Sequence, residues 1–303
     1  MGTWGAGLYS SDTTADLRDD FRAVVRAPWD GDRLVAWALS AYTGAADPAD
    51  EEFTDLRLAL ADQLWTYGID HSPTFEAALR IVDDGSDLAT KRLHGMRDRD
   101  LARRAKALDL LAQKLRSANP KPRSRRTLSA PEPFALEAGD CLVYPTSGGE
   151  VRNPYVGPRK EERFYAVHRW AADGWASAIV LACYRKHDVF ARYLVALLRS
   201  DPERPPKPEE FAAFSILHTT KFGASPRRRV EAVTTTRLHL ERMRVEIVGR
   251  LAIDAVKVAT EFASDRPPIS KHGDDRNFAN DAWIDPPGRE VLQFDDPVGR
   301  YLI

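Results

Sequence analysis

Apolar residues recur with the period of an α-helix through the first 118 residues. Two stripes have a spacing near 3.6 residues, which is the repeat of an amphipathic helix. They are formed by Phe53, Leu56, Leu60, Leu64 and Tyr67, and by Leu101, Ala105, Leu108, Ala112 and Leu115. Because each stripe requires a partner surface to bury it, we expect a small bundle of about four or five short antiparallel helices.

Capping residues mark the boundaries of individual helices. Ser72 can accept a hydrogen bond from a free backbone amide, Pro73 suits the first helical position, and Gly85 suits a left-handed stop. These signals predict a helix between the two stripes. Earlier helices are predicted at 12–26, where an Ala-Pro step ends the pattern, and at 34–42.

A proline-rich basic segment separates this region from the rest of the chain. Residues 119–133 contain four prolines and four basic residues, with one apolar side chain of any size. Such a composition is typical of an exposed, semi-rigid linker. We therefore place a linker there.

Beyond the linker, short runs of β-branched and aromatic residues alternate with turn residues. They predict strands at Cys141–Tyr144, Phe164–Trp170 and Ser177–Tyr184. Residues 189–198 fit either a helix or a strand. Residues 234–254 also fit both, and strands up to Gly249 are favoured because their threonine, valine and isoleucine content lowers helix propensity.

These patterns predict an α+β protein with two folded regions. A helical domain covers residues 1–118, the linker covers 119–133, and a mixed β-rich body with a few helices covers 134–303. The 303 residues, 43% of them hydrophobic, are enough for two cores. The longest apolar run is much shorter than the ~20 residues that a membrane span requires, and the N-terminus has no signal-peptide pattern, so we expect a cytoplasmic protein.

The net charge of -1 conceals a segregation of charge along the chain. Residues 1–90 hold 17 acidic and 6 basic residues, whereas residues 91–130 hold 13 basic and 3 acidic residues. An acidic region next to a basic one can be neutralised within the molecule or across a dimer, which is the favoured interpretation, or it can provide two candidate binding surfaces. The first is an acidic surface for a basic protein partner, made of Asp47, Asp50, Glu51, Glu52 and Asp55. The second is a phosphate-binding surface made of Arg99, Arg103, Lys106, Arg123, Arg125 and Arg126.

The N-terminal half resembles bacterial proteins of unknown function whose chains begin Met-Gly-x-Trp-Gly. The likeness covers about the first 145 residues, and it includes the basic helix and the proline-basic segment before Phe134. Its motifs are Met1-Gly2-Thr3-Trp4-Gly5, Leu8-Tyr9, Asp12, Ala15-Asp16, Asp19-Asp20-Phe21 and residues 81–88 (IVDDGSDL). Residues 138–145 (AGDCLVYP) are similar to the first strand of small β-rich modules found in such proteins and in some immunity proteins, which bind and neutralise a toxin. The resemblance implies a bacterial cytoplasmic protein and supplies no catalytic residues.

The sequence holds none of the motifs that usually mark a catalytic site. It lacks a His-Glu-x-x-His helix, a phosphate-binding P-loop and a Gly-x-Ser-x-Gly turn. Cys141 or Cys183 could pair with His168 or His187 as a thiol–imidazole couple, but both cysteines lie in apolar runs typical of buried thiols. A polar stretch at 271–285, with one histidine and several carboxylates, lacks the ligand spacing of a calcium loop.

We therefore expect no cofactor, no metal and no membrane partner, and we assign no catalytic residue. The leading hypothesis is a non-catalytic protein-interaction factor, regulatory or immunity-like, with a partner that the sequence does not identify. An enzyme that processes nucleotides or nucleic acid is the alternative, with a DNA-binding accessory protein as a third possibility. No aromatic residue is interleaved with the basic residues at 91–126, which disfavours base stacking.

Overall fold

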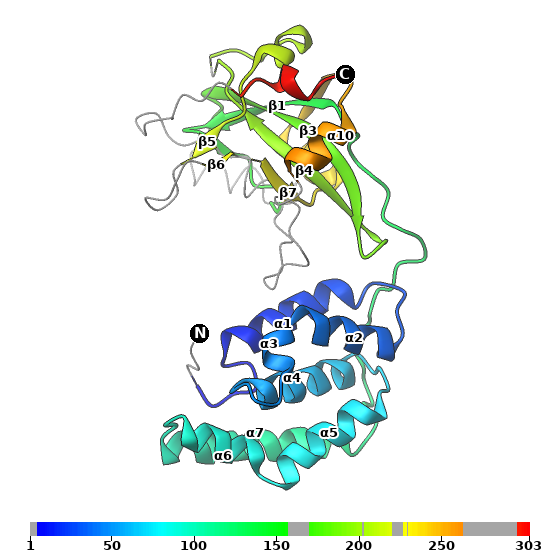
Figure 1. Ribbon diagram of the computed structural model, residues 1–303, viewed down its shortest axis with the longest axis vertical. Helices are drawn as coiled ribbons and strands as arrows, with labels where there is room; N and C mark the ends of the chain where they lie inside the picture. The colour runs from blue at the N-terminus through cyan, green and yellow to red at the C-terminus, as the bar shows by residue number, and fades with distance from the viewer. Residues whose placement is uncertain (1–4, 157–169, 202, 220–226, 229, 263–295) are drawn as a thin grey trace. The chain divides into compact units, whose positions relative to one another are not determined.

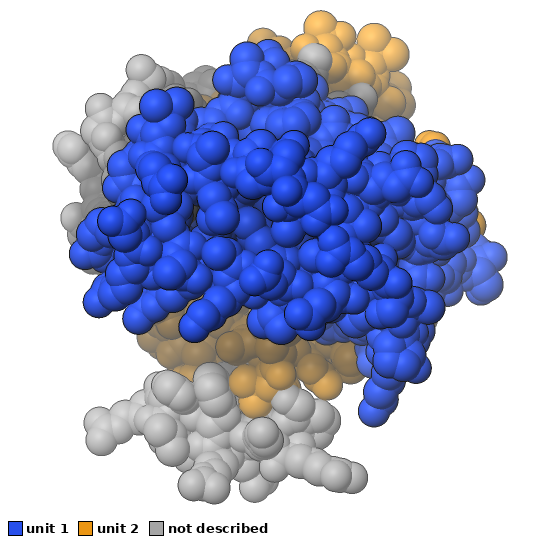
Figure 2. All heavy atoms as spheres, turned by 90° about the horizontal axis from the view of Figure 1, so that it is seen from below, with its two compact units in different colours: residues 1–130, 269–273 blue, residues 131–268, 274–303 orange. Residues whose placement is uncertain are grey.

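The computed structural model describes residues 5–156, 170–201, 203–219, 227–228, 230–262 and 296–303. The chain divides into two compact units, with the boundary between Ala130 and Pro131. We call the N-terminal part unit 1 and the C-terminal part unit 2, and Figure 2 colours them blue and orange. Unit 1 is helical and unit 2 contains an antiparallel sheet, so the predicted α+β class is confirmed (Figure 1).

Within its described residues, unit 1 contains seven α-helices. The sequence predicts fewer, because the short α3 and α6 carry no clear apolar stripe. They are α1 (Asp12–Val24), α2 (Gly31–Ala41), α3 (Thr43–Ala46), α4 (Phe53–Thr66), α5 (Ser72–Asp83), α6 (Ser86–Leu93) and α7 (Asp98–Leu115). The predicted helices at 12–26 and 34–42 and both apolar stripes correspond to α1, α2, α4 and α7. The helix predicted after Ser72 is α5, but its N-cap is His71, whose side chain accepts from the Thr74 amide at 3.3 Å.

The central helix of unit 1 is α4, which contacts α1, α5 and α7. Ten of its residues are buried, and they include Asp55, Asp62 and Gln63. Polar side chains are therefore enclosed together with the apolar stripe. Leu58 and Ala61 pack with Leu108, Leu111 and further residues of α5 and α7 into one hydrophobic cluster.

The segment predicted as a linker is hydrogen-bonded to unit 1 along most of its length. The Asn119 side chain donates to the Trp65 carbonyl, the Arg123 amide donates to the Thr66 carbonyl, and the Leu128 amide donates to the Arg26 carbonyl. Arg125 donates to the carbonyls of residues 25, 27 and 29 at 3.2, 3.1 and 2.6 Å. The chain then reaches unit 2, where the Glu132 amide donates to the Val189 carbonyl at 2.9 Å.

Unit 2 is built on a curled antiparallel sheet, of which Figure 1 labels β1, β3, β4 and β7. The strand order is β2-β1-β3-β4-β7, with β8 also paired to β1. Its strands are β1 (Asp140–Ser147), β2 (Glu150–Val151), β3 (Gly174–Lys186), β4 (Phe190–Leu198), β7 (Val230–Val233) and β8 (Glu246–Arg250), and β5 (His218–Thr219) pairs separately with β6 (Arg227–Arg228). The strands predicted at 141–144 and 177–184 lie in β1 and β3. Residues 189–198, which fitted a helix or a strand, form β4, and every residue of β4 is buried.

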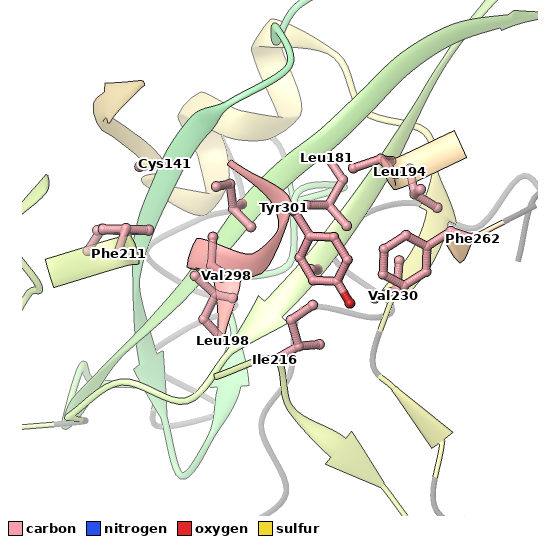
Figure 3. Close-up of a cluster of buried hydrophobic side chains, with 14 residues drawn as sticks. Cys141, Leu181, Leu194, Leu198, Phe211, Ile216, Val230, Phe262, Val298 and Tyr301 are labelled. Carbon is pink, nitrogen blue, oxygen red and sulfur yellow. The ribbon is translucent and has the colours of Figure 1, made fainter. Parts of the chain in front are cut away.

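Both faces of this sheet are covered. On one face, Leu142, Tyr144 and Tyr193 pack with Leu240 and Met243 of α9 (Arg237–Met243). The other face is covered by η1 (Pro208–Ala213), α10 (Ala255–Glu261) and η3 (Val298–Tyr301). Figure 3 shows the side chains of this second core, which include Leu181, Leu194, Phe211, Phe262 and Tyr301.

Of the other sequence predictions for unit 2, one is partly wrong and one concerns residues that are mostly not described. The favoured strand assignment up to Gly249 is wrong for residues 237–243, which form α9, and correct for 246–249, which lie in β8. Thr236 caps α9 by accepting from the His239 amide at 3.2 Å, and Arg244 ends it with a φ of 59°. The strand predicted at 164–170 falls almost entirely outside the described residues. Among the helices that the structure describes, none has the length and apolar character needed to cross a membrane.

Candidate functional site

A cavity of about 880 Å³ lies in unit 1. It is open to solvent on one side and is lined by the N-terminal segment before α1, the turn before α4, the end of α6, the loop after it and the N-terminal part of α7. The lining residues are Gly5, Ala6, Gly7, Glu51, Glu52, Lys91, His94, Gly95, Met96, Arg97, Arg99, Asp100, Arg103 and Ala107. Its volume lies within the ~300–1,000 Å³ of ligand-binding cavities, but its lining is far more polar than is usual for them.

A buried ion network supports the cavity. Arg104, 2% exposed, donates to both carboxylate oxygens of Asp87 at 2.9 Å and to Asp55 Oδ1 at 2.6 Å. Lys91, which lines the cavity, donates to the other oxygen of Asp55. Arg104 also donates to the carbonyl of Gly7 at 2.7 Å. The network therefore joins α4, α6 and α7 to the N-terminal segment that lines the cavity.

The charges of this network balance. Burial disfavours the charged form of Arg104. Hydrogen bonds and electrostatic attraction to Asp87 and Asp55 favour it more strongly, so the pKa of Arg104 is raised. Asp87 also accepts from the Thr54 hydroxyl at 3.0 Å. Two carboxylates thus face two cations, which satisfies the requirement that buried charges be paired.

Two glutamates before α4, which we call the acidic wall, line the cavity. Glu52 is buried and accepts from the Thr13 hydroxyl at 2.6 Å. Glu51 is exposed, and its Oε2 lies 3.1 Å from His94 Nδ1. The acidic wall therefore combines a fixed carboxylate with one that solvent and a ligand can reach.

Three arginines near the start of α7, which we call the arginine wall, also line the cavity. Arg97 donates to Asp100 Oδ2 from Nε at 3.1 Å and from Nη2 at 2.9 Å. Arg103 and Arg99 lie 3.6 and 3.8 Å from Asp100 Oδ1. Their side chains are 63% and 68% exposed. One carboxylate therefore faces three guanidinium groups.

The five residues predicted as an acidic protein-binding surface are not one surface in the structure. Asp55 is buried in the ion network, and Glu52 is buried at the cavity. Asp47 and Asp50 accept hydrogen bonds from the backbone amides of residues 49 and 52 at 2.9 and 2.8 Å, so they hold the turn before α4. Only Glu51 and Glu52 reach the cavity.

The six residues predicted as a phosphate-binding surface separate in the same way. Arg99 and Arg103 line the cavity, whereas Lys106, exposed on the same helix, does not. Arg123 lies over the Tyr67 ring at 5.7 Å. Arg125 is partly buried among carbonyls, where burial lowers its pKa, and Arg126 is exposed with a φ of 50°.

Sequence reasoning missed several residues of the site and its support, among them Lys91, Arg97, Asp100 and Arg104. Arg104 gave a signal that could have been recognised. It lies three residues after Leu101 and four before Leu108, which places it on the apolar face of α7. A charged residue at such a position requires a buried partner.

The other candidate residues that the structure describes show no reactive arrangement. Cys141 and Cys183 are free thiols whose pKa values are raised to about 11, mainly by burial and further by the charge of Asp140. His187 lies in the β3–β4 turn with a φ of 57°, and His168 lies outside the described residues. The described residues contain no cluster of three or more side chains suited to a metal, and the polar stretch at 271–285 is not among them.

The chain was compared with protein-family models, with curated proteins and with solved structures, and none of these comparisons gave a match.

Proposed function

We propose that this chain is a non-catalytic protein-binding factor, regulatory or immunity-like, that acts in the bacterial cytoplasm. We further propose that the cavity of unit 1 holds part of its protein partner. The presence of the acidic wall and the arginine wall in one cavity supports this proposal most strongly. A lining with both signs of charge is complementary to a peptide segment that also carries both signs.

The same lining disfavours a nucleic acid. A nucleic-acid backbone is uniformly negative, so Glu51 and Glu52 would repel it at the surface where the arginines attract it. No tryptophan, tyrosine or phenylalanine is among the described lining residues, so stacking of a base has no platform. A peptide can instead place a basic side chain near Glu51 and an acidic one near the arginine wall.

The cavity also has the rigidity that a binding site needs. Lys91 and Gly7 are held by the ion network, and Glu52 is held by Thr13. A site whose side chains are already fixed loses less conformational entropy when a partner binds. The exposed side chains of Glu51, Arg99 and Arg103 are then the groups that contact the partner.

The test is affinity capture of the partner from cell lysate, with and without nuclease treatment. The site variant carries Arg99→Glu and Arg103→Glu. A control with the same change in net charge carries Lys106→Glu and Lys121→Glu, two exposed residues that do not line the cavity. Thermal unfolding of each variant confirms that both remain folded.

We expect one nuclease-resistant protein with the native chain and with the control, and its loss from the site variant. If the control loses the partner as completely as the site variant does, the general basic charge binds it and the cavity does not. If nuclease treatment removes all captured material, the chain binds nucleic acid, which is the alternative function.

A further inference from the structure

Arg99 and Arg103 converge on a single oxygen of Asp100. Arg103 Nη1 lies 3.6 Å and Arg99 Nε 3.8 Å from Asp100 Oδ1. Both distances exceed hydrogen-bond length. Within the described residues neither guanidinium has a hydrogen-bond partner, and both side chains are more than half exposed. The two cations are therefore gathered around one point while their N–H donors stay available.

The other oxygen of Asp100 is already occupied. Arg97 donates to Asp100 Oδ2 from two nitrogens, at 3.1 and 2.9 Å. The single negative charge of Asp100 thus lies close to the positive charges of three arginines. Arg99 and Arg103 lie one helical turn apart, where like charges repel each other. An additional anion between them would relieve this repulsion and use the free donors.

The chemistry of the site selects the kind of anion. The planar guanidinium matches the two oxygens of a carboxylate. Glu51 and Glu52 line the same cavity, and they repel a doubly charged phosphate more strongly than a singly charged carboxylate. The carboxylate of an acidic side chain or of a chain terminus fits both conditions.

We infer that Arg99 and Arg103, beside Asp100, form a preformed site for one carboxylate group of the protein partner. This inference rests on the proposed function, because it takes the partner to be a protein held in the cavity. It adds which atoms hold the partner and what chemical group they hold.

The experiment uses the full chain with nitrogen-labelled arginine, at low salt, and follows the side-chain Nε–H signals by NMR. Three probes are added separately: a short end-blocked peptide of alternating glycine and glutamate, the same peptide with glutamine in place of glutamate, and inorganic phosphate. We expect the glutamate peptide to shift the signals of Arg99 and Arg103 along a saturating curve. The glutamine peptide should leave them unchanged, and phosphate should bind more weakly than the glutamate peptide.

Two variants separate a defined site from a basic helix face. Arg99→Gln with Arg103→Gln should weaken binding of the glutamate peptide by about tenfold or more, as expected for lost hydrogen bonds between charged groups. Lys106→Gln should leave the affinity unchanged. An equal loss with Lys106→Gln, phosphate binding as tight as that of the peptide, or no response to the glutamate peptide would each overturn the inference. If the last result occurs while partner capture still depends on the cavity, only the carboxylate site is refuted and the proposed function stands.

Discussion

Replacement of Arg104 by methionine is the most informative perturbation of unit 1. Methionine keeps much of the side-chain volume but removes all four hydrogen bonds that Arg104 makes to Asp87, Asp55 and Gly7. Asp55 would keep Lys91, whereas Asp87, fully buried, would keep only the Thr54 hydroxyl among the described contacts. The variant therefore leaves a buried carboxylate without a cation.

The magnitude follows from that uncompensated charge. Removal of one partner of a buried ion pair costs about 3–5 kcal/mol of unfolding free energy. For a unit of this size, that corresponds to a fall in melting temperature of roughly 12–20 °C. Removal of the carboxylate as well, in Arg104→Met with Asp87→Leu, should recover a large part of the loss, because no charge is then left unpaired.

The assay is urea unfolding followed by far-ultraviolet circular dichroism, which reports mainly the helices of unit 1. Lys106→Met, on the exposed side of the same helix, is the control and should change the free energy by less than about 0.5 kcal/mol. An Arg104→Met variant as stable as the native chain would refute the buried network. A double variant less stable than Arg104→Met would refute the reasoning that the orphaned carboxylate causes the loss.

Three further predictions concern other parts of the chain. Gly139 has a φ of 91°, and an added Cβ would lie 1.9 Å from the carbonyl oxygen of residue 251. Gly139→Ala should therefore destabilise unit 2 by well over the ~1–2 kcal/mol of left-handed strain expected for Gly148→Ala, where an added Cβ meets nothing, and calorimetry of both variants measures the difference. Because burial raises the pKa of the Cys183 thiol to about 11, its rate of reaction with iodoacetamide should rise about tenfold per pH unit from neutral pH up to about pH 11. A rate that instead levels off near the ordinary cysteine pKa of ~8.5 would contradict the burial argument. Arg125→Gln should lower the stability of unit 1 by about 1–3 kcal/mol, because three carbonyls lose a hydrogen bond from the guanidinium. Arg126→Gln, at an exposed position, should not, and urea unfolding of both variants measures the difference.

The longer helices of unit 1, α1, α2, α4, α5 and α7, could be predicted because their apolar stripes and end signals are local, whereas the short α3 and α6 could not. The strands β1 and β3 were predictable because runs of β-branched and aromatic residues between turn residues are also local signals, but their pairing was not. In contrast, α9 was missed because the capping bond of Thr236 and the burial of Leu240 and Met243 outweigh the low helix propensity of the neighbouring residues.

The candidate site was only partly predictable, because its polar residues pair over long distances in sequence. Asp55 and Arg104 are 49 positions apart, and nothing local to either residue identifies the other. Asp55 was therefore grouped with the acidic residues next to it in sequence. In the structure it is buried, because α4 is packed on several sides. Arg99 and Arg103 could be named as candidate binding residues because basic residues spaced along one helix face are visible in the sequence, and both line the cavity. The sequence did not indicate that Asp100 lies near both of them.

Site-specific photo-crosslinking in living cells tests most directly whether the cavity binds a protein partner. A photoreactive phenylalanine analogue replaces Met96, which lines the cavity, or Leu110, which is 60% exposed on α7 and does not line it. We predict a discrete crosslinked protein from position 96 that disappears when Arg99 and Arg103 are changed to glutamate, and no such product from position 110. Crosslinking to the same protein from position 110 but not from position 96 would contradict the assignment of the cavity as the binding site.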